Sequence, residues 1–222
     1  TARFLMIMPS TTMLPAPMTA ATGMDALTHA IEAFTSRART AATDRDAATA
    51  IRLITEFLPV AYANPGDARA REMVALGSFL AGNAFTRAGL GYVHAISHQI
   101  SAHYNTPHGL ANAILLPRVL RFNQTACSER FAALERMLQG DAAAPYAPDQ
   151  TQQFIERIDT LAETLGIPVS LGDVQEKDFT AIAKDALAEA RYSYAVPKVM
   201  RKRDVTKILQ SVSSGNRGVS FA

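Results

Sequence analysis

The stretch TAATGMDALTHAIEAF, residues 19–34, decides the fold of this chain. It is rich in residues of high helix propensity, and Leu27, Ile31 and Phe34 recur at the three- and four-residue spacing that places side chains on one face of a helix. The segment therefore predicts an amphipathic helix whose apolar face is buried.

The same helical pattern continues through most of the remaining sequence. Further helices are expected at residues 43–63, 67–85, 90–102, 107–122, 128–138, 149–165, 176–191 and 203–212. Gly166, Pro168 and Pro197 interrupt the pattern, and residues 140–149 are expected to form a flexible loop. A short apolar run at residues 4–8 predicts one strand, and strand signals are nearly absent after it. We therefore predict an all-α fold with a short N-terminal strand.

Composition limits the classes of protein to which the chain can belong. Its 222 residues are 48% hydrophobic and 19% charged, which is enough apolar mass for one large domain or two small ones. The net charge of +2 is too small to indicate nucleic-acid binding, and no apolar run is long enough for an export signal or a membrane span. The single cysteine, Cys127, excludes an intrachain disulfide, so we expect a cytoplasmic location.

The histidines are concentrated in two short windows. The first window holds His29, and the second holds His94, His98, His103 and His108. Asp25 stands four residues before His29, which places both side chains on one face of their helix. His94 and His98 are spaced in the same way, and His108 follows in the turn sequence NTPHG. Aspartate and histidine side chains that converge in this manner predict a metal site.

The spacing also separates the histidines from one another. At about 100° per residue, His103 lies about 180° around the helix from His94, so we expect it to point away from the site.

Because His94 is followed by Ala95, the HExxH motif of zinc proteases is absent, and peptide hydrolysis is disfavoured. One aspartate and several neutral imidazoles suit Fe2+ and would also accept Zn2+.

Two segments, residues 19–36 and 88–123, closely resemble the signature segments of the iron-containing (group III) alcohol dehydrogenases. Enzymes of this family have an N-terminal dinucleotide-binding domain and a C-terminal helical domain like that of dehydroquinate-synthase-like enzymes, with the metal and substrate in the cleft between them. The resemblance covers the helical half only. It implies that residues 1–18 are a residual strand and linker from a missing nucleotide-binding domain, and that residues 19–222 are the all-helical metal-binding domain.

The resemblance also implies roles for individual residues. Carried over position by position, it implies four metal ligands: Asp25, His29, His94 and His108. It further implies that His98 is a catalytic residue beside the nicotinamide of the cofactor, where it could relay the hydroxyl proton to solvent. The alternative for His98 is a histidine with a packing role.

Three further positions bear on the predicted site. Phe85 is expected to form an apolar wall of the substrate pocket, or else to be a core residue. Arg87 stands where the family usually has an asparagine that contacts the substrate; it could bind an anionic substrate, or it is a helix-end arginine that faces water. Glu32, three residues after His29, could support a metal ligand, or it is a solvated glutamate or part of a structural ion pair.

The resemblance predicts a metal-dependent, NAD(P)-linked alcohol dehydrogenase or aldehyde reductase with Fe2+ in its site. The sequence has no GxGxxG or comparable phosphate-binding loop, so we expect NAD(P) to bind through the missing N-terminal domain. The expected partners are a small alcohol or aldehyde, that missing domain, and further copies of the chain, because an uncovered apolar face favours a homo-oligomer. The alternatives are a dehydroquinate-synthase-like or glycerol-dehydrogenase-like enzyme, and a non-catalytic metal-binding helical module.

Overall fold

The computed structural model describes residues 14–216 and 218–221. In this part of the chain the helices are α3 (Ala16–Thr35), α4 (Ala41–Ala63), α5 (Ala68–Ala88), α6 (Tyr92–Tyr104), α7 (His108–Asn123), α8 (Ser128–Leu138), α9 (Asp149–Thr164), the short 3-10 helix η1 (Glu176–Asp178), α10 (Phe179–Ser193) and α11 (Lys202–Ser214). The described residues contain no strand, which confirms the predicted all-α fold; the predicted strand at residues 4–8 lies outside them. Among the described helices, none combines the length and the apolar character needed to cross a membrane.

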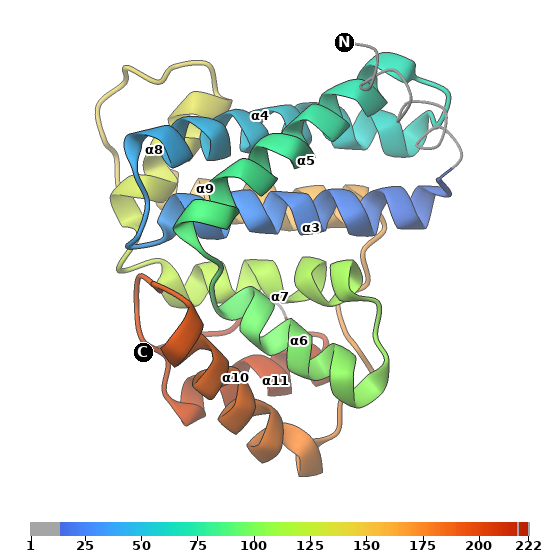
Figure 1. Ribbon diagram of the computed structural model, residues 1–222, viewed down its shortest axis with the longest axis vertical. Coiled ribbons are helices and arrows are strands. Elements are labelled where there is room, and N and C mark those ends of the chain that lie inside the picture. The colour runs from blue at the N-terminus through green and yellow to red at the C-terminus, as the bar shows by residue number, and fades with distance from the viewer. Residues whose placement is uncertain (1–13, 217, 222) are drawn as a thin grey trace.

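The α3 helix runs through the middle of the molecule and is covered from several sides (Figure 1). It packs against α4 and α5 on one side and against α7 on the other. Met24, Leu27 and Ile31 on this helix have no more than 1% of their surface exposed. The stretch that predicts an amphipathic helix therefore forms the centre of the core.

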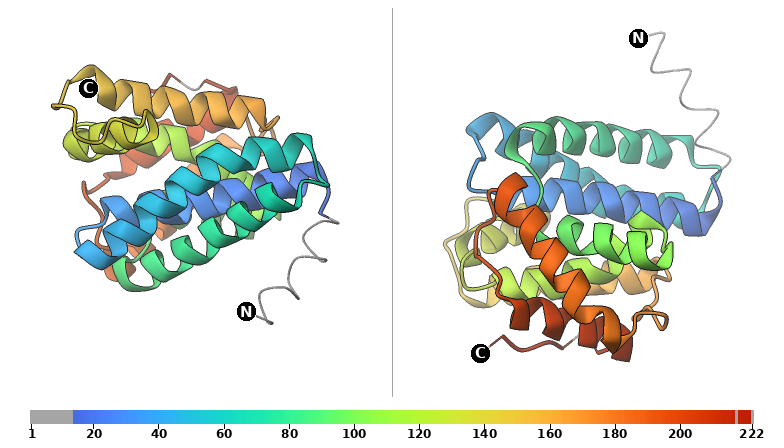
Figure 2. Two further views of the ribbon diagram at one scale, coloured as in Figure 1. Left: turned by 90° about the horizontal axis from the view of Figure 1, so that it is seen from above. Right: turned by 60° about the horizontal axis from the view of Figure 1, so that its bottom comes forward.

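The remaining helices extend this core beyond α7. The α6 helix packs against α7 and α10, α10 packs against α11, and α8 packs against α9. Figure 1 shows α10 and α11 on the side of α6 and α7 that faces away from α4 and α5, and in the right-hand view of Figure 2 α11 lies at the opposite end of the molecule from α5. The three helices that carry the predicted ligands, α3, α6 and α7, therefore meet inside the molecule, with α7 in contact with both of the others.

The α3 and α4 helices begin two or three residues earlier than predicted, each for a local reason. The α3 helix begins at Ala16 because Pro17 stands in the first turn, where the missing N–H of a proline removes no helical hydrogen bond. The α4 helix begins at Ala41 because Thr40 caps it. The Thr40 hydroxyl accepts from the backbone N–H of Thr43 at 3.2 Å, and the N–H of Thr40 donates to the Thr43 hydroxyl at 2.8 Å.

A close approach of α7 to α3 positions the start of α7. Gly109 is the second residue of α7, and a Cβ atom at this position would lie 2.5 Å from the backbone oxygen of Ala21 on α3. Only a residue without a side chain fits at that distance. The contact brings His108, the residue before Gly109, to Asp25.

The other half of α7 is held by a buried arginine. Arg118 is 1% exposed, and its Nε donates to Oγ of Ser211 on α11 at 2.9 Å. Its terminal nitrogens donate to the backbone oxygens of Ile114 and Val169 at 2.6 and 2.7 Å. A buried guanidinium requires such acceptors. They join α7 to α11 and to the loop that follows α9.

We expect Gly109→Ala to destabilise the protein. The added methyl group would collide with a backbone atom, which cannot turn away, and overpacking of this kind lowers the free energy of unfolding by about 1–3 kcal/mol. Gly82→Ala in α5 is the matched control, because a Cβ atom there meets nothing within 4 Å. Alanine in place of glycine favours a helix by about 1 kcal/mol. Urea denaturation measures both variants, and equal stability of the two would contradict the close contact at Gly109.

Candidate metal centre

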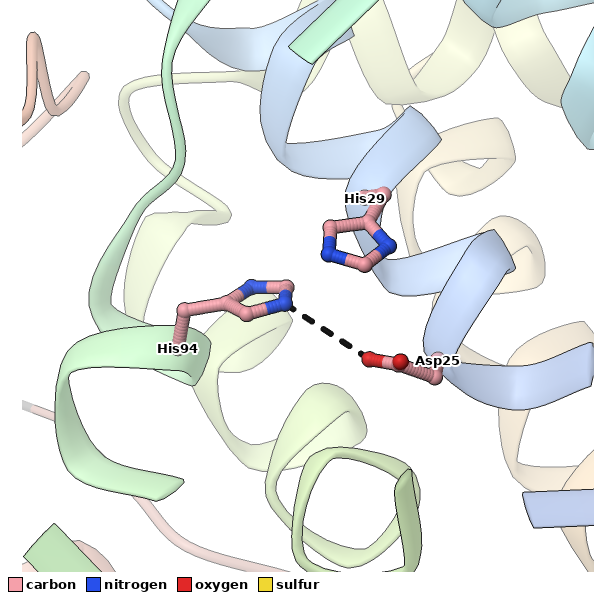
Figure 3. A group of neighbouring side chains, drawn as sticks. All are labelled: Asp25, His29 and His94. Atoms are coloured by element: carbon pink, nitrogen blue, oxygen red, sulfur yellow. Dashed lines mark ion pairs between the residues drawn. The ribbon is translucent and has the colours of Figure 1, made fainter. Parts of the chain in front are cut away.

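Three helices bring the predicted ligands together. Asp25 and His29 project from α3, His94 projects from α6, and His108 is the first residue of α7. Figure 3 shows the side chains of Asp25, His29 and His94 pointing toward one another. One ligand atom from each of these three residues lies within 4.8 Å of the others. His108 is not part of this group and meets the cluster through Asp25.

The distances at Asp25 fit a divalent metal ion. Oδ1 of Asp25 lies 3.6 Å from Nε2 of His94 and 3.5 Å from Nε2 of His108. Two ligand atoms that each lie about 2.0–2.2 Å from one ion in a tetrahedral arrangement are about 3.4 Å apart. A carboxylate oxygen and imidazole nitrogens are donors that Fe2+ and Zn2+ both accept. The residues present therefore fit such an ion.

The buried carboxylate of Glu32 orients His94. Nδ1 of His94 lies 2.6 Å from Oε2 of Glu32, and the backbone N–H groups of Gly91 and Val93 donate to the same carboxylate at 2.8 and 2.7 Å. A side chain at Gly91 would block this contact, because its Cβ atom would lie 2.7 Å from Oε1 of Glu32. Glu32 is only 6% exposed, so the alternative of a solvated glutamate is wrong. The arrangement turns Nε2 of His94 toward Asp25.

The cluster favours a positive charge at its centre. Burial by itself lowers the pKa of His94, but the carboxylates of Glu32 and Asp25 outweigh it and raise this pKa to about 9. Burial, and then the positive charge on His94, lower the pKa of His29 to about 4. Burial also lowers the pKa of His108. The cluster thus holds one proton on His94, and a metal ion that binds to this histidine has to displace it.

His98, the predicted catalytic residue, is held by a carboxylate from another helix. Its Nδ1 lies 2.7 Å from Oε1 of Glu189 on α10, and the hydroxyl of Tyr194 donates to the same oxygen at 2.6 Å. Gln99 donates to the other oxygen of Glu189 at 3.0 Å. Because a carboxylate only accepts hydrogen bonds, Nδ1 of His98 carries the proton and Nε2 is left as an acceptor.

The other predicted residues fall at different distances from the cluster. The ring of Phe85 stacks on His29, with centroids 4.3 Å apart and planes inclined by 18°, so this ring borders the cluster. Arg87 is exposed in the last turn of α5, which agrees with a helix-end arginine that faces water. His103 is exposed and lies outside the group of converging ligands, as expected. A role of Phe85 and Arg87 in a substrate pocket stays a prediction.

Two polar residues that border the site, Asn112 and Glu189, were not recognised in the sequence. The side-chain nitrogen of Asn112 donates to Oδ1 of Asp25 at 2.6 Å. Since Asn112 follows His108 by four residues, its place on the same face of α7 is a signal that could have identified it. Glu189 is separated from His98 by 91 residues and reaches it through the packing of α10 on α6, for which the local sequence carries no signal.

The cluster lies within a region that matches known proteins. Residues 19–213 match the profile of the Fe-containing alcohol dehydrogenase family, C-terminal part. The chain is 42% identical over 198 residues to the 1,3-propanediol dehydrogenase of Citrobacter freundii, a match that covers 88% of this chain and 51% of that protein. It is 37% identical over 199 residues to the NAD-dependent methanol dehydrogenase of Bacillus methanolicus, which covers 89% of this chain and 52% of that protein.

A solved structure has the same fold. The alcohol dehydrogenase from Oenococcus oeni matches with a TM-score of 0.83 and 37% sequence identity, over 90% of this chain and 53% of that one. The chain spans about half the length of the curated relatives that it matches. All four predicted metal ligands lie inside the range that matches the family profile.

We expect Glu32→Gln to weaken both the fold and the metal site. The amide would turn an N–H2 group toward backbone N–H groups or toward His94, and buried donors left without acceptors cost about 1–3 kcal/mol. Loss of the hydrogen bond that orients a metal ligand lowers metal affinity by about 10–100-fold. Thermal unfolding and Zn2+ titration measure the two effects, with Glu56→Gln on the exposed face of α4 as the control. Unchanged Zn2+ affinity in the Glu32 variant would show that His94 does not depend on this carboxylate.

Zn2+ binding should weaken as the pH falls below about 9, the raised pKa of His94. At lower pH the ion has to displace a proton from this histidine, so the affinity decreases by about tenfold for each pH unit. Titrations against a chromophoric chelator at about pH 7 and pH 8 measure the slope. An affinity that does not change between these two values would mean that His94 binds no proton in the metal-free protein.

Proposed function

The chain belongs to the Fe-containing alcohol dehydrogenase family, and on this basis we propose that it is the metal-binding part of a metal-dependent, NAD(P)-linked alcohol dehydrogenase or aldehyde reductase. The observation that supports the proposal most directly is the convergence of Asp25, His29 and His94, whose ligand atoms lie within 4.8 Å of one another. We expect small alcohols or aldehydes as substrates, because relatives of the chain are named for 1,3-propanediol and methanol.

Four residues are assigned to the metal. Asp25, His29, His94 and His108 would hold a ferrous ion or a zinc ion. When bound, such an ion supplies Lewis-acid chemistry at the oxygen of the alcohol or aldehyde. The protein contributes the fixed position of the donors: Glu32 holds the ring of His94 through Nδ1, so that Nε2 faces the carboxylate of Asp25.

His98 is assigned to proton transfer. Because Glu189 keeps the proton on Nδ1, Nε2 can accept the hydroxyl proton of an alcohol and pass it to water, or deliver a proton in the reverse direction. The ring of His98 stacks against that of His108, with centroids 5.1 Å apart, which keeps it beside the ligand cluster. Its side chain is 40% exposed and therefore has access to solvent.

The nicotinamide cofactor is assigned to a nucleotide-binding domain that is not part of these 222 residues. The relatives extend well beyond the region of the match, which covers 51% and 52% of their lengths. The sequence also lacks a glycine-rich loop that could bind the phosphates of a dinucleotide. Phe85, stacked on His29, would form an apolar wall beside the substrate. Arg87, which is exposed, would contribute to substrate binding only if the substrate is anionic.

The proposal is tested with the full polypeptide that contains this chain, loaded with Fe2+ under anaerobic conditions or with Zn2+. We expect NADH or NADPH to be oxidised when a small aldehyde is added, and we expect chelation to abolish the activity and added metal to restore it. His98→Gln should lower kcat by about 10²–10⁴-fold, the usual contribution of a general acid–base group, with unchanged metal content.

His103→Gln is the matched control for the His98 variant. His103 is an exposed histidine of the same helix, and its replacement should leave kcat unaltered. Metal binding without aldehyde-dependent oxidation of NAD(P)H would make the protein a non-catalytic metal-binding module. Full activity after complete removal of metal would contradict the metal-dependent reaction.

A further inference from the structure

The side chain of Asn112 contacts the ligand cluster from α7. Asn112 is 0% exposed. Its Nδ2 lies 2.6 Å from Oδ1 of Asp25, and it lies 3.0 Å from Nε2 of His108 and 3.2 Å from Nε2 of His94. The amide nitrogen thus has two acceptors among the proposed ligands, Oδ1 of Asp25 and Nε2 of His108, and it also lies beside Nε2 of His94.

The charge of Asp25 determines which way the amide of Asn112 points. If the amide were turned around, its Oδ1 would face a carboxylate oxygen, and two acceptors would lie against each other. The N–H2 group therefore points into the cluster. In this orientation, Oδ1 of Asn112 is buried and has no hydrogen-bond partner among the residues that the structure describes. A buried carbonyl oxygen in that state is unfavourable.

A divalent cation in the cluster would repel the positive end of the N–H2 group of Asn112. It would also require the lone pairs of Asp25 and His108, which the amide nitrogen now engages. The amide and the ion therefore compete for the same atoms.

We propose that the amide of Asn112 stands in for the cation in the metal-free protein and is displaced when a metal ion binds. The inference rests on the metal site proposed above, and it does not rest on the reaction proposed there. In this role Asn112 stabilises the metal-free protein and opposes metal binding. A residue that supports the ligands in the metal-bound protein would instead promote binding, so the two roles can be separated by experiment.

The two roles predict opposite effects of Asn112→Ala on the Zn2+ affinity of the full chain. If Asn112 stands in for the cation, its removal raises the affinity by about threefold to tenfold, the net contribution of one hydrogen bond. If Asn112 supports bound metal, its removal lowers the affinity by about 10–100-fold. Competition with a chromophoric chelator measures the affinity without any assay of activity. An affinity that falls or stays the same would overturn the proposal.

Thermal unfolding gives a second readout with a matched control. Asn112→Ala should lower the Tm of the metal-free protein, and saturation with Zn2+ should recover most of the loss. Asn123, at the opposite end of α7, is also buried and also has an Oδ1 without a partner among the described residues. Asn123→Ala should lower the Tm equally with and without Zn2+. Parallel behaviour of the two variants would argue against a stand-in.

A second substitution keeps the test informative if the alanine variant does not fold. Asn112→Leu keeps a side chain of similar volume and removes the amide donor without adding a metal donor, so it should lower the Tm of the metal-free protein and raise the Zn2+ affinity by about threefold to tenfold. Failure of the wild-type chain to bind Zn2+ would overturn the metal site and this inference with it. Binding by the wild type, with no gain of affinity in either variant, would overturn the inference alone.

Discussion

The buried carboxylate of Glu32 is the interaction on which the candidate site depends. It belongs to α3, and it accepts hydrogen bonds from the backbone at the start of α6 and from His94. The start of a helix is also where a negative charge is stabilised by the helix dipole. A carboxylate that is 6% exposed persists only when its oxygens are paired, so α6 cannot slide along α3 without breaking these bonds. The two helices that carry three of the four proposed ligands are therefore locked together by a residue that is not itself a proposed ligand.

The spacing of residues along the sequence predicts only those parts of the site that lie on a single helix. The relation between Asp25 and His29 requires nothing beyond the geometry of an α-helix, and the helical fold follows from the periodicity of the apolar residues. The contact between Glu32 and His94 depends on how α6 docks on α3, and no local pattern encodes that docking. The helix ends were also less predictable than the helices, because a capping residue such as Thr40 fixes the first residue of a helix independently of the apolar pattern.

Different helices position the groups for the two chemical tasks that we propose. The metal donors come from α3, α6 and α7, whereas His98 is oriented from α10 through Glu189. Both groups share α6, because His94 and His98 are one turn apart on this helix, with ring centroids separated by 5.9 Å. One turn of a helix packed against α7 and α10 thus sets the spacing between a proposed ligand and the proposed proton relay, without a contribution from a loop.

The proposed ligands differ in their access to solvent. The side chain of His94 is 1% exposed and that of Asp25 23%, whereas that of His108 is 37% exposed. His108 is also the first residue of its helix, and helix ends open more readily than helix centres. Among these three proposed ligands, His108 is therefore the one that solvent reaches most readily, and His94 is the one most shielded from it. The donors themselves would accept Fe2+ or Zn2+, so the metal bound would depend on the ions that the surroundings supply as well as on the donors.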